Sequence, residues 1–248
     1  MTFTDELWQA AAPVLEAIDK LPFLIALEDG SLPRDHFDYY MAQDAHYLAS
    51  YGRVLASAAG QADKPDDLLF WAGSATTAVS VERQLHAAHV ADFTAVEASP
   101  TCTAYTSYLL SLVTSGCYPA LVAGLLPCFW IYENVGRRLK DRIGDLVGHP
   151  YADWIDAYGD PGFAAATGQA RAIVDRAAEQ TGRADRERMR RTFATAARYE
   201  WMFWDAAWRR ETWPVWASDR PRSTFGAERS ARSAQDSQRD RDCRDHRS

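Results

Sequence analysis

The sequence lacks the features of a membrane or secreted protein. It contains no apolar run of about eighteen residues that could cross a bilayer, and no basic start followed by an apolar segment. It has few cysteines, and they form no Cys-x-x-Cys pair and no spacing typical of a zinc site or a disulfide framework: Cys102, Cys117, Cys128 and Cys243. We therefore expect a cytoplasmic protein with free thiols.

Positive charge is scarce as well. The chain carries 27 Lys and Arg against 34 Asp and Glu, which leaves a formal net charge of -7. Binding to nucleic acid needs a surplus of cations on one face, and the body of the chain contains no such surplus. A glycine-rich phosphate loop, a Gly-x-Ser-x-Gly elbow and a His-Glu-x-x-His motif are also absent. The sequence thus favours neither a nucleic-acid partner nor these common catalytic classes.

The sequence also lacks segments in which β-branched and polar residues alternate, a pattern that is typical of strands. Apolar residues instead recur at intervals of three and four, which predicts helices almost throughout. Of the 248 residues, 47% are hydrophobic and 12% are aromatic, enough for the core of one globular domain. The expected fold class is all-α with a single domain.

Capping residues, prolines and glycines predict where the helices begin and end. The first helix is expected to start after Thr4 as its N-cap, to run to Ile18 and to bend at Pro13. The further expected helices cover about residues 33–59, 65–91, 101–115, 119–140, 161–180 and 184–210.

The composition changes after about Ala217, where Ser, Arg and Asp dominate and one aromatic residue remains. Such a segment cannot bury enough apolar surface to offset the entropy lost on ordering. We expect a helical domain over residues 1–217 and a disordered polar tail over residues 218–248. Because charges of both signs alternate there and no aromatics lie between them, a solvated extension is favoured over an RNA-binding arm.

Two acids fall on helix faces that are otherwise apolar. Asp44 lies on the stripe that includes Met41 and Tyr47, and Glu200 lies on the stripe that includes Phe203. A buried carboxylate is costly unless it is paired or hydrogen-bonded. Each acid alone is explained as well by a buried ion pair or a capping role, but two on separate helices favour a shared pocket.

Cys128 and Tyr132 lie one turn apart on the apolar stripe of the helix expected over 119–140. A buried free cysteine is more often a small apolar residue than a nucleophile. Pro127 is expected to kink this helix and to loosen the packing at Cys128. Tyr105, on the apolar face of another helix, adds a hydroxyl that needs a partner. A thiol, two acids and several tyrosines would suit a small, flat, nitrogen-bearing ring.

His86 and His89, with Glu82 one turn earlier, raise the question of a metal site. A di-iron carboxylate bundle would need Glu-x-x-His on two helices and further glutamates, and this pattern does not occur. No histidine stands out as an axial haem ligand. We therefore expect neither a metal nor another cofactor.

Several segments closely resemble the TenA/thiaminase II family, in order and over about residues 4–216. They are YYMAQDAHYL (39–48), AYTSYL (104–109), LLPCFWIYENVG (125–136), DWIDAYG (153–159) and RYEWMFWDAAW (198–208). The resemblance, to the cysteine-containing members, implies a haem-oxygenase-like helical bundle without haem, assembled as a homotetramer. It also implies aminopyrimidine aminohydrolysis in thiamin salvage, which turns an aminomethyl pyrimidine into the hydroxymethyl pyrimidine and ammonia, together with thiaminase II activity.

The resemblance also implies roles for individual residues. Cys128 matches the nucleophile, Glu200 the acid/base at a ring nitrogen, and Asp44 the carboxylate that holds the amino edge. Four tyrosines fall on positions that line the pocket: Tyr47, Tyr105, Tyr132 and Tyr158. The alternative is a noncatalytic pyrimidine or thiamin-binding protein on the same fold, which would need neither the thiol nor the acid/base residue. A metal-dependent oxygenase of related fold would need ligands that this sequence does not present.

Overall fold

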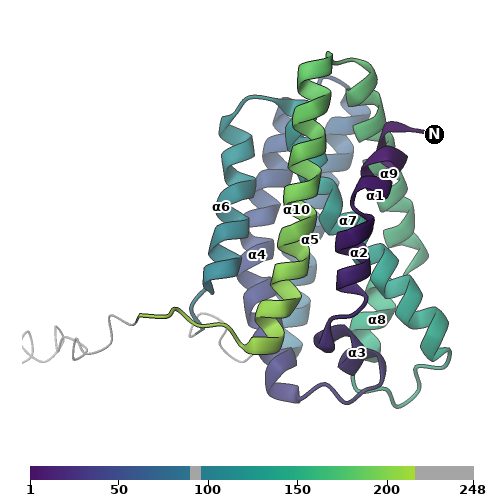
Figure 1. Ribbon diagram of the computed structural model, residues 1–248, viewed down its shortest axis with the longest axis vertical. Coiled ribbons are helices and arrows are strands. Elements are labelled where there is room, and N and C mark those ends of the chain that lie inside the picture. The colour runs from purple at the N-terminus through teal and green to yellow at the C-terminus, as the bar shows by residue number, and fades with distance from the viewer. Residues whose placement is uncertain (90–95, 216–248) are drawn as a thin grey trace, which may run out of the picture. The chain divides into compact units, whose positions relative to one another are not determined.

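The computed structural model describes residues 1–89 and 96–215, with side chains other than those of residues 81–89. Residues 1–212 form one compact unit, and a second unit begins at Trp213. All regular elements in the described ranges are helices (Figure 1): α1 (Phe3–Ala10), α2 (Ala12–Ile18), α3 (Pro22–Glu28), α4 (Arg34–Gln61), α5 (Pro65–His89), α6 (Pro100–Thr114), α7 (Tyr118–Ile143), α8 (Ala152–Tyr158), α9 (Pro161–Glu179) and α10 (Arg183–Arg209). The all-α prediction is confirmed.

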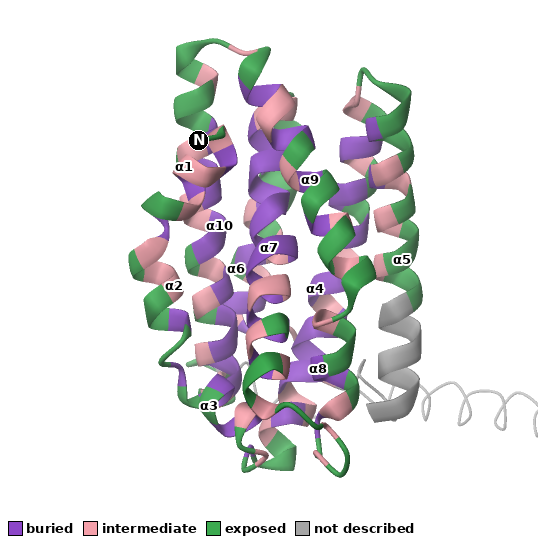
Figure 2. Cartoon of the chain, turned by 90° about the vertical axis from the view of Figure 1, so that its right-hand side faces the viewer, coloured by how far each residue is buried: buried purple, intermediate pink, exposed green. Residues whose placement is uncertain are grey.

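The core lies between the long helices of the first unit. α4 packs along α5 and also contacts α6, while α7 packs between α10 and α9 and contacts α8. Figure 2 shows the buried residues gathered along α4, α7 and α10. The largest side chains with almost no exposed surface are aromatic: Trp71, Trp204, Tyr40, Tyr105, Phe23 and Phe193. These three helices therefore supply much of the core.

The N-terminal helix corrects the predicted cap. Thr2, rather than Thr4, is the N-cap of α1, and its hydroxyl accepts the Asp5 N–H while the Asp5 carboxylate accepts the Thr2 N–H. Thr4 is buried and binds Asp175 on α9 through its backbone N–H and its hydroxyl. The expected bend is a break, because Pro13, which lacks an N–H, falls in the first turn of a separate helix α2.

The later boundaries within the described residues agree closely with the predicted ones, and the predicted end at residue 91 lies outside them. Ser99 caps α6 and Asp160 caps α9, each directly before a proline in the first turn. Two short helices, α3 and α8, were not predicted, because seven residues are too few to show a helical period. α7 runs without interruption through Pro127, the position where a kink was expected.

The approach of α8 to α7 depends on Gly136. A Cβ atom there would lie 2.5 Å from the backbone carbon of Tyr158, closer than side chains tolerate. Any larger residue would push Tyr158 away from α7. Gly136 therefore positions a tyrosine that belongs to the predicted site.

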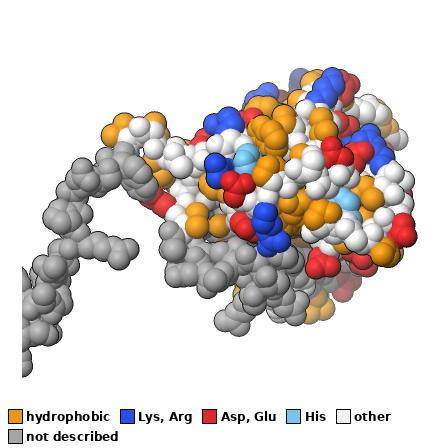
Figure 3. Space-filling model, turned by 90° about the horizontal axis from the view of Figure 1, so that it is seen from below, with side chains coloured by type: hydrophobic (Ala, Val, Ile, Leu, Met, Phe, Trp, Pro, Cys, Tyr) orange, Lys and Arg blue, Asp and Glu red, His pale blue; other side chains and the backbone are white. Residues whose placement is uncertain are grey.

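The surface mixes both signs of charge. Figure 3 shows Lys and Arg side chains interspersed with Asp and Glu on one face, and ion pairs such as Arg34 with Asp38 and Arg210 with Asp35 are exposed. No described helix is both long and apolar enough to span a bilayer. The predicted tail over residues 218–248 lies outside the described residues.

Candidate active site

Three helices bring the thiol and the two predicted acids into one neighbourhood. Asp44 on α4 is 3% exposed and Glu200 on α10 is 1% exposed. Burial is the main cause that raises the pKa of the Cys128 thiol on α7 and of Glu200, and the carboxyls add to it: Glu200 and Asp44 at the thiol, and Asp44 at Glu200. Each group therefore acts electrostatically on the others, although they are far apart in the sequence.

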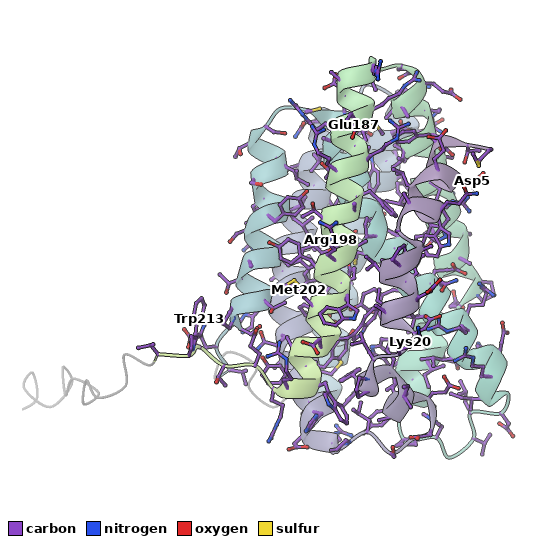
Figure 4. All side chains as sticks on the ribbon, viewed as in Figure 1. Asp5, Lys20, Glu187, Arg198, Met202 and Trp213 are labelled. Atoms are coloured by element: carbon purple, nitrogen blue, oxygen red, sulfur yellow. The ribbon has the colours of Figure 1, made fainter. Side chains whose placement is uncertain are left out.

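Glu200 is buried because α10 is amphipathic. Figure 4 labels Arg198 and Met202, two residues before and after it, and both are exposed on the outer side of the helix. The Tyr105 hydroxyl on α6 donates to Glu200 Oε1 at 2.6 Å, which favours the carboxylate. Burial outweighs this bond and raises the pKa of Glu200 to about 8. At neutral pH the group thus holds a proton that it can donate.

Cys128 lies at the edge of a cavity. It is half-buried, and burial raises the pKa of its thiol well above the usual value. The Tyr47 and Tyr51 hydroxyls lie close enough to favour the thiolate in part. The Tyr51 hydroxyl already donates to the Leu125 carbonyl at 2.8 Å. The buried Tyr47 hydroxyl has no hydrogen-bond partner within the described residues, so it can serve a ligand or the thiolate.

The remaining predicted tyrosines surround the same region. Tyr132 accepts a hydrogen bond from the Tyr40 hydroxyl at 3.2 Å. Its ring centroid lies 4.8 Å from those of Tyr158 and Trp204. On the other side of the site, the Tyr47 ring lies 5.0 Å from that of Tyr105. The structure thus gathers all the predicted site residues from α4, α6, α7, α8 and α10.

A cavity of about 580 Å³ reaches this cluster from one side. Its wall is mostly apolar and includes Tyr51, Phe70, Cys128, Phe129, Tyr158 and Phe163. Asp44 and Glu200 do not line it. Cys128 therefore lies between an open apolar cavity and the two buried carboxyls. Among the described side chains, no three His, Cys, Asp or Glu residues are grouped as they would be around a metal ion.

Sequence reasoning missed several aromatic contacts. Tyr40, Tyr51 and Trp204 lie on the predicted apolar stripes, where an aromatic residue is normally core material. Trp204 is part of the core, but the structure shows that its indole N–H is buried without a hydrogen-bond partner within the described residues. His86 and His89 lie in the part of α5 whose side chains are not described.

The chain matches the TENA/THI-4/PQQC family over residues 8–210. It is 33% identical over 221 residues to an aminopyrimidine aminohydrolase of Bacillus subtilis, covering 86% of this chain and 92% of that protein. It is 36% identical over 207 residues to the thiamine biosynthesis multifunctional protein ThiED of Corynebacterium glutamicum. That match covers 84% of this chain but only 27% of ThiED, so the chain spans about a quarter of that relative.

Solved structures show the same architecture. A TenA homologue protein from P. horikoshii OT3 has a TM-score of 0.75 and 28% identity, covering 84% of this chain and 99% of that one. A domain with a heme oxygenase-like fold from Shewanella denitrificans has a TM-score of 0.64 at 16% identity, covering 84% of this chain and 92% of that one. The fold is therefore that of the haem-oxygenase-like helical proteins. Within that class, the chain belongs to the TENA/THI-4/PQQC family.

Proposed function

We propose that the protein is an aminopyrimidine aminohydrolase of thiamin salvage. It would hydrolyse 4-amino-5-aminomethyl-2-methylpyrimidine to the 5-hydroxymethyl pyrimidine and ammonia. The observation that carries this proposal is the placement of the Cys128 thiol beside two buried carboxyls, Asp44 and Glu200. Relatives named aminopyrimidine aminohydrolase support it, since they align over most of this chain.

In the proposed reaction, Cys128 is the nucleophile and Glu200 the acid. Addition of Sγ to the pyrimidine breaks its aromaticity, and this is easier when Glu200 donates a proton to a ring nitrogen as the C–S bond forms. The thiol proton passes to the substrate amine, and the ring electrons then expel that amine from the exocyclic methylene as ammonia. Water adds its hydroxyl to the methylene and gives its proton back to Glu200. The C–S bond then breaks, and the proton on the ring nitrogen returns to Sγ, which regenerates the thiol and the aromatic ring. Covalent catalysis in this way divides one difficult displacement into easier steps.

The tyrosines would hold the flat ring. The Tyr47 and Tyr132 rings come from α4 and α7, and aromatic faces suit the stacking of a pyrimidine. The unpaired Tyr47 hydroxyl and Trp204 N–H are donors that a bound polar ring could satisfy. Asp44 would accept hydrogen bonds from the amino edge of the ring.

Ammonia release from the aminomethyl pyrimidine, measured beside thiamin cleavage, tests the proposal directly. The alternative, a noncatalytic pyrimidine or thiamin-binding protein on this fold, predicts binding of either compound with no release of ammonia. Purified wild type that binds the aminomethyl pyrimidine without turning it over would therefore support the alternative. We also propose a homotetramer, which light scattering on the purified protein would measure.

Replacing Asp44 by alanine is expected to weaken substrate capture more than turnover. Loss of a hydrogen bond to a charged group costs about 1.5–3 kcal/mol, which corresponds to a KM raised by roughly tenfold to a hundredfold. Steady-state kinetics would measure both constants. Asp38→Ala is the matched control, since Asp38 lies on the same helix but pairs with Arg34 at the surface. Unchanged KM and kcat in Asp44→Ala would contradict the assigned role.

The cavity beside Cys128 supports the proposed thiaminase II activity, because it has room for a leaving group far larger than ammonia. Gly73 lines this cavity, and apart from its chain neighbours and the nearby backbone of α5 no described atom lies within 4 Å of the place where its Cβ would be. Gly73→Phe is expected to lower kcat/KM for thiamin by about tenfold or more, while that for the aminomethyl pyrimidine changes by less than about twofold.

Gly60→Phe controls for the cost of a large residue on a helix. Gly60 also has open space around it, but it does not line the cavity. Equal losses on both substrates in Gly73→Phe would show that the leaving group does not occupy this cavity.

A further inference from the structure

We propose that Tyr199 is a positioning residue for the acid/base carboxyl: it holds the ring of Tyr105 so that the Tyr105 hydroxyl donates to Glu200. The inference deepens the proposed function and rests on it for the role of Glu200. Tyr199 lies in the segment RYEWMFWDAAW (198–208), but the sequence gives it no role of its own. It is the geometry of α6 against α10 that assigns this role.

Tyr105 is held at two points by consecutive residues of α10. Its hydroxyl lies 2.6 Å from Glu200 Oε1, and its ring is stacked on that of Tyr199 with centroids 5.0 Å apart and planes 10° from parallel. Neighbouring side chains on a helix point about 100° apart, so one faces the core while the next faces an adjacent helix. Glu200 is accordingly buried and Tyr199 is half-buried beside α6.

A second ring limits Tyr105 from α4. The Tyr47 centroid lies 5.0 Å from that of Tyr105, with planes 35° apart. No ring contact joins Tyr47 to Tyr199 among the described residues, so the two rings lie on different parts of the Tyr105 surface. Removing Tyr199 would free the side of the phenol that faces α10, where no other ring of the described residues is stacked on Tyr105.

The position of this phenol matters because the hydrogen bond is short and becomes charge-assisted when Glu200 ionises. Such bonds weaken steeply when the donor moves or tilts. Without the Tyr199 ring stacked on it, the Tyr105 ring would move more, and its hydroxyl would donate to Glu200 for only part of the time. Glu200 would then lose a contact that favours its ionised form.

Other groups that face Glu200 are not expected to compensate. They are Asp44, Tyr40, Tyr47 and Tyr51 on α4, Cys128 and Tyr132 on α7, and Tyr158 at the end of α8. The printed contacts of Glu200 include a hydrogen bond from Tyr105 alone. Tyr105 is therefore the route by which Tyr199 can act on the carboxyl.

The test is the pH at which Glu200 titrates in variants of Tyr199. Burial and the Tyr105 bond together place its pKa at about 8 in the wild type. Tyr199→Leu is expected to raise it by about 0.5–1 unit, while Tyr199→Phe, which retains the ring, leaves it unchanged. The pH profile of kcat/KM for the aminomethyl pyrimidine measures this value. Tyr199→Met, which keeps volume without a ring, serves if the leucine variant does not fold.

A double-mutant cycle shows whether the effect passes through Tyr105. Tyr105→Phe removes the donor, so adding Tyr199→Leu to it should produce no further shift. Tyr118→Leu is the matched control, because Tyr118 is also half-buried but its hydroxyl accepts from Trp71, outside the site. A shift that persists in the Tyr105→Phe background, or a Tyr199→Leu profile equal to wild type, would overturn the inference.

A measurement without turnover separates this inference from the proposed function. NMR titration of ¹³C-labelled glutamate, assigned with Glu200→Gln, reports the same pKa on the substrate-free protein. A shift in Tyr199→Leu with no hydrolysis by the wild type would retain the positioning role and reject the aminohydrolase. Hydrolysis by the wild type with no shift would reject the positioning role alone.

Discussion

Cys128→Ser is expected to reduce ammonia release from the aminomethyl pyrimidine by about a thousandfold or more. The serine hydroxyl is far less acidic than a thiol, and the site already opposes ionisation, because burial and both carboxyls raise the pKa of the group at this position. A weaker nucleophile in the same place would leave only binding and general acid catalysis. Steady-state assays of ammonia measure the loss.

The structure itself should survive this change. Serine is close to cysteine in size, and Cys128 is half-buried at a cavity wall, so the stability should change by no more than about 1 kcal/mol. Cys117→Ser is the matched control, since Cys117 is half-buried as well but lies at the start of α7 near Asp185. Turnover near that of the wild type in Cys128→Ser would remove the covalent mechanism.

Glu200→Gln is expected to lower turnover by orders of magnitude while making the protein more stable at high pH. Glutamine cannot donate a carboxyl proton to a ring nitrogen, so the covalent step loses its acid catalyst. Its side chain can still accept the Tyr105 hydrogen bond, so the packing around it is preserved. The pH profile of the remaining activity should lose the limb near pH 8.

The stability effect follows from the raised pKa. Below about pH 4.5, Glu200 is protonated in both the folded and the unfolded chain, and its burial costs no ionisation energy. As the pH rises from about 4.5 to about 8, the unfolded chain ionises first and the folded state loses relative stability. Above that range the penalty is complete, on the order of a few kcal/mol. Glu200→Gln has no carboxyl to ionise, so this penalty does not apply to it.

Urea unfolding at pH 5 and pH 9 would measure this difference. The gain of Glu200→Gln over wild type should be small at pH 5 and large at pH 9. Glu16→Gln, at an exposed position of α2, is the matched control for the loss of one surface carboxyl. A gain that is the same at both pH values would contradict the raised pKa of Glu200.

The burial of both acids of the proposed site could be predicted, because a polar residue on an apolar helix stripe stands out as an exception to the helical period. Asp44 and Glu200 stand out as acids on apolar stripes, and both are almost fully buried in the structure. Cys128 was ambiguous, since the same pattern fits a packing residue. The cavity at its side chain is a tertiary feature formed by residues of α4, α5, α7, α8 and α9.

Other features could not be predicted, because more than one residue in the same stretch of sequence fits the same local role. Thr2 and Thr4 are both plausible caps, and the partner that decided between them, Asp175, lies on α9. The position of Tyr158 depends on a short helix that packs against Gly136. Neither contact leaves a periodic signal in the sequence.

The sequence by itself determined the helical class, most helix boundaries and the polar groups that would be buried, because these depend on local spacing and on the cost of burying charge. Only the tertiary structure decided which groups meet. The Tyr105 bond to Glu200 joins residues 95 positions apart, and the Tyr199 ring that is stacked on Tyr105 lies next to Glu200 on α10. Proton affinity depends on such neighbours and on desolvation, so the chemistry of the site is a property of the folded chain.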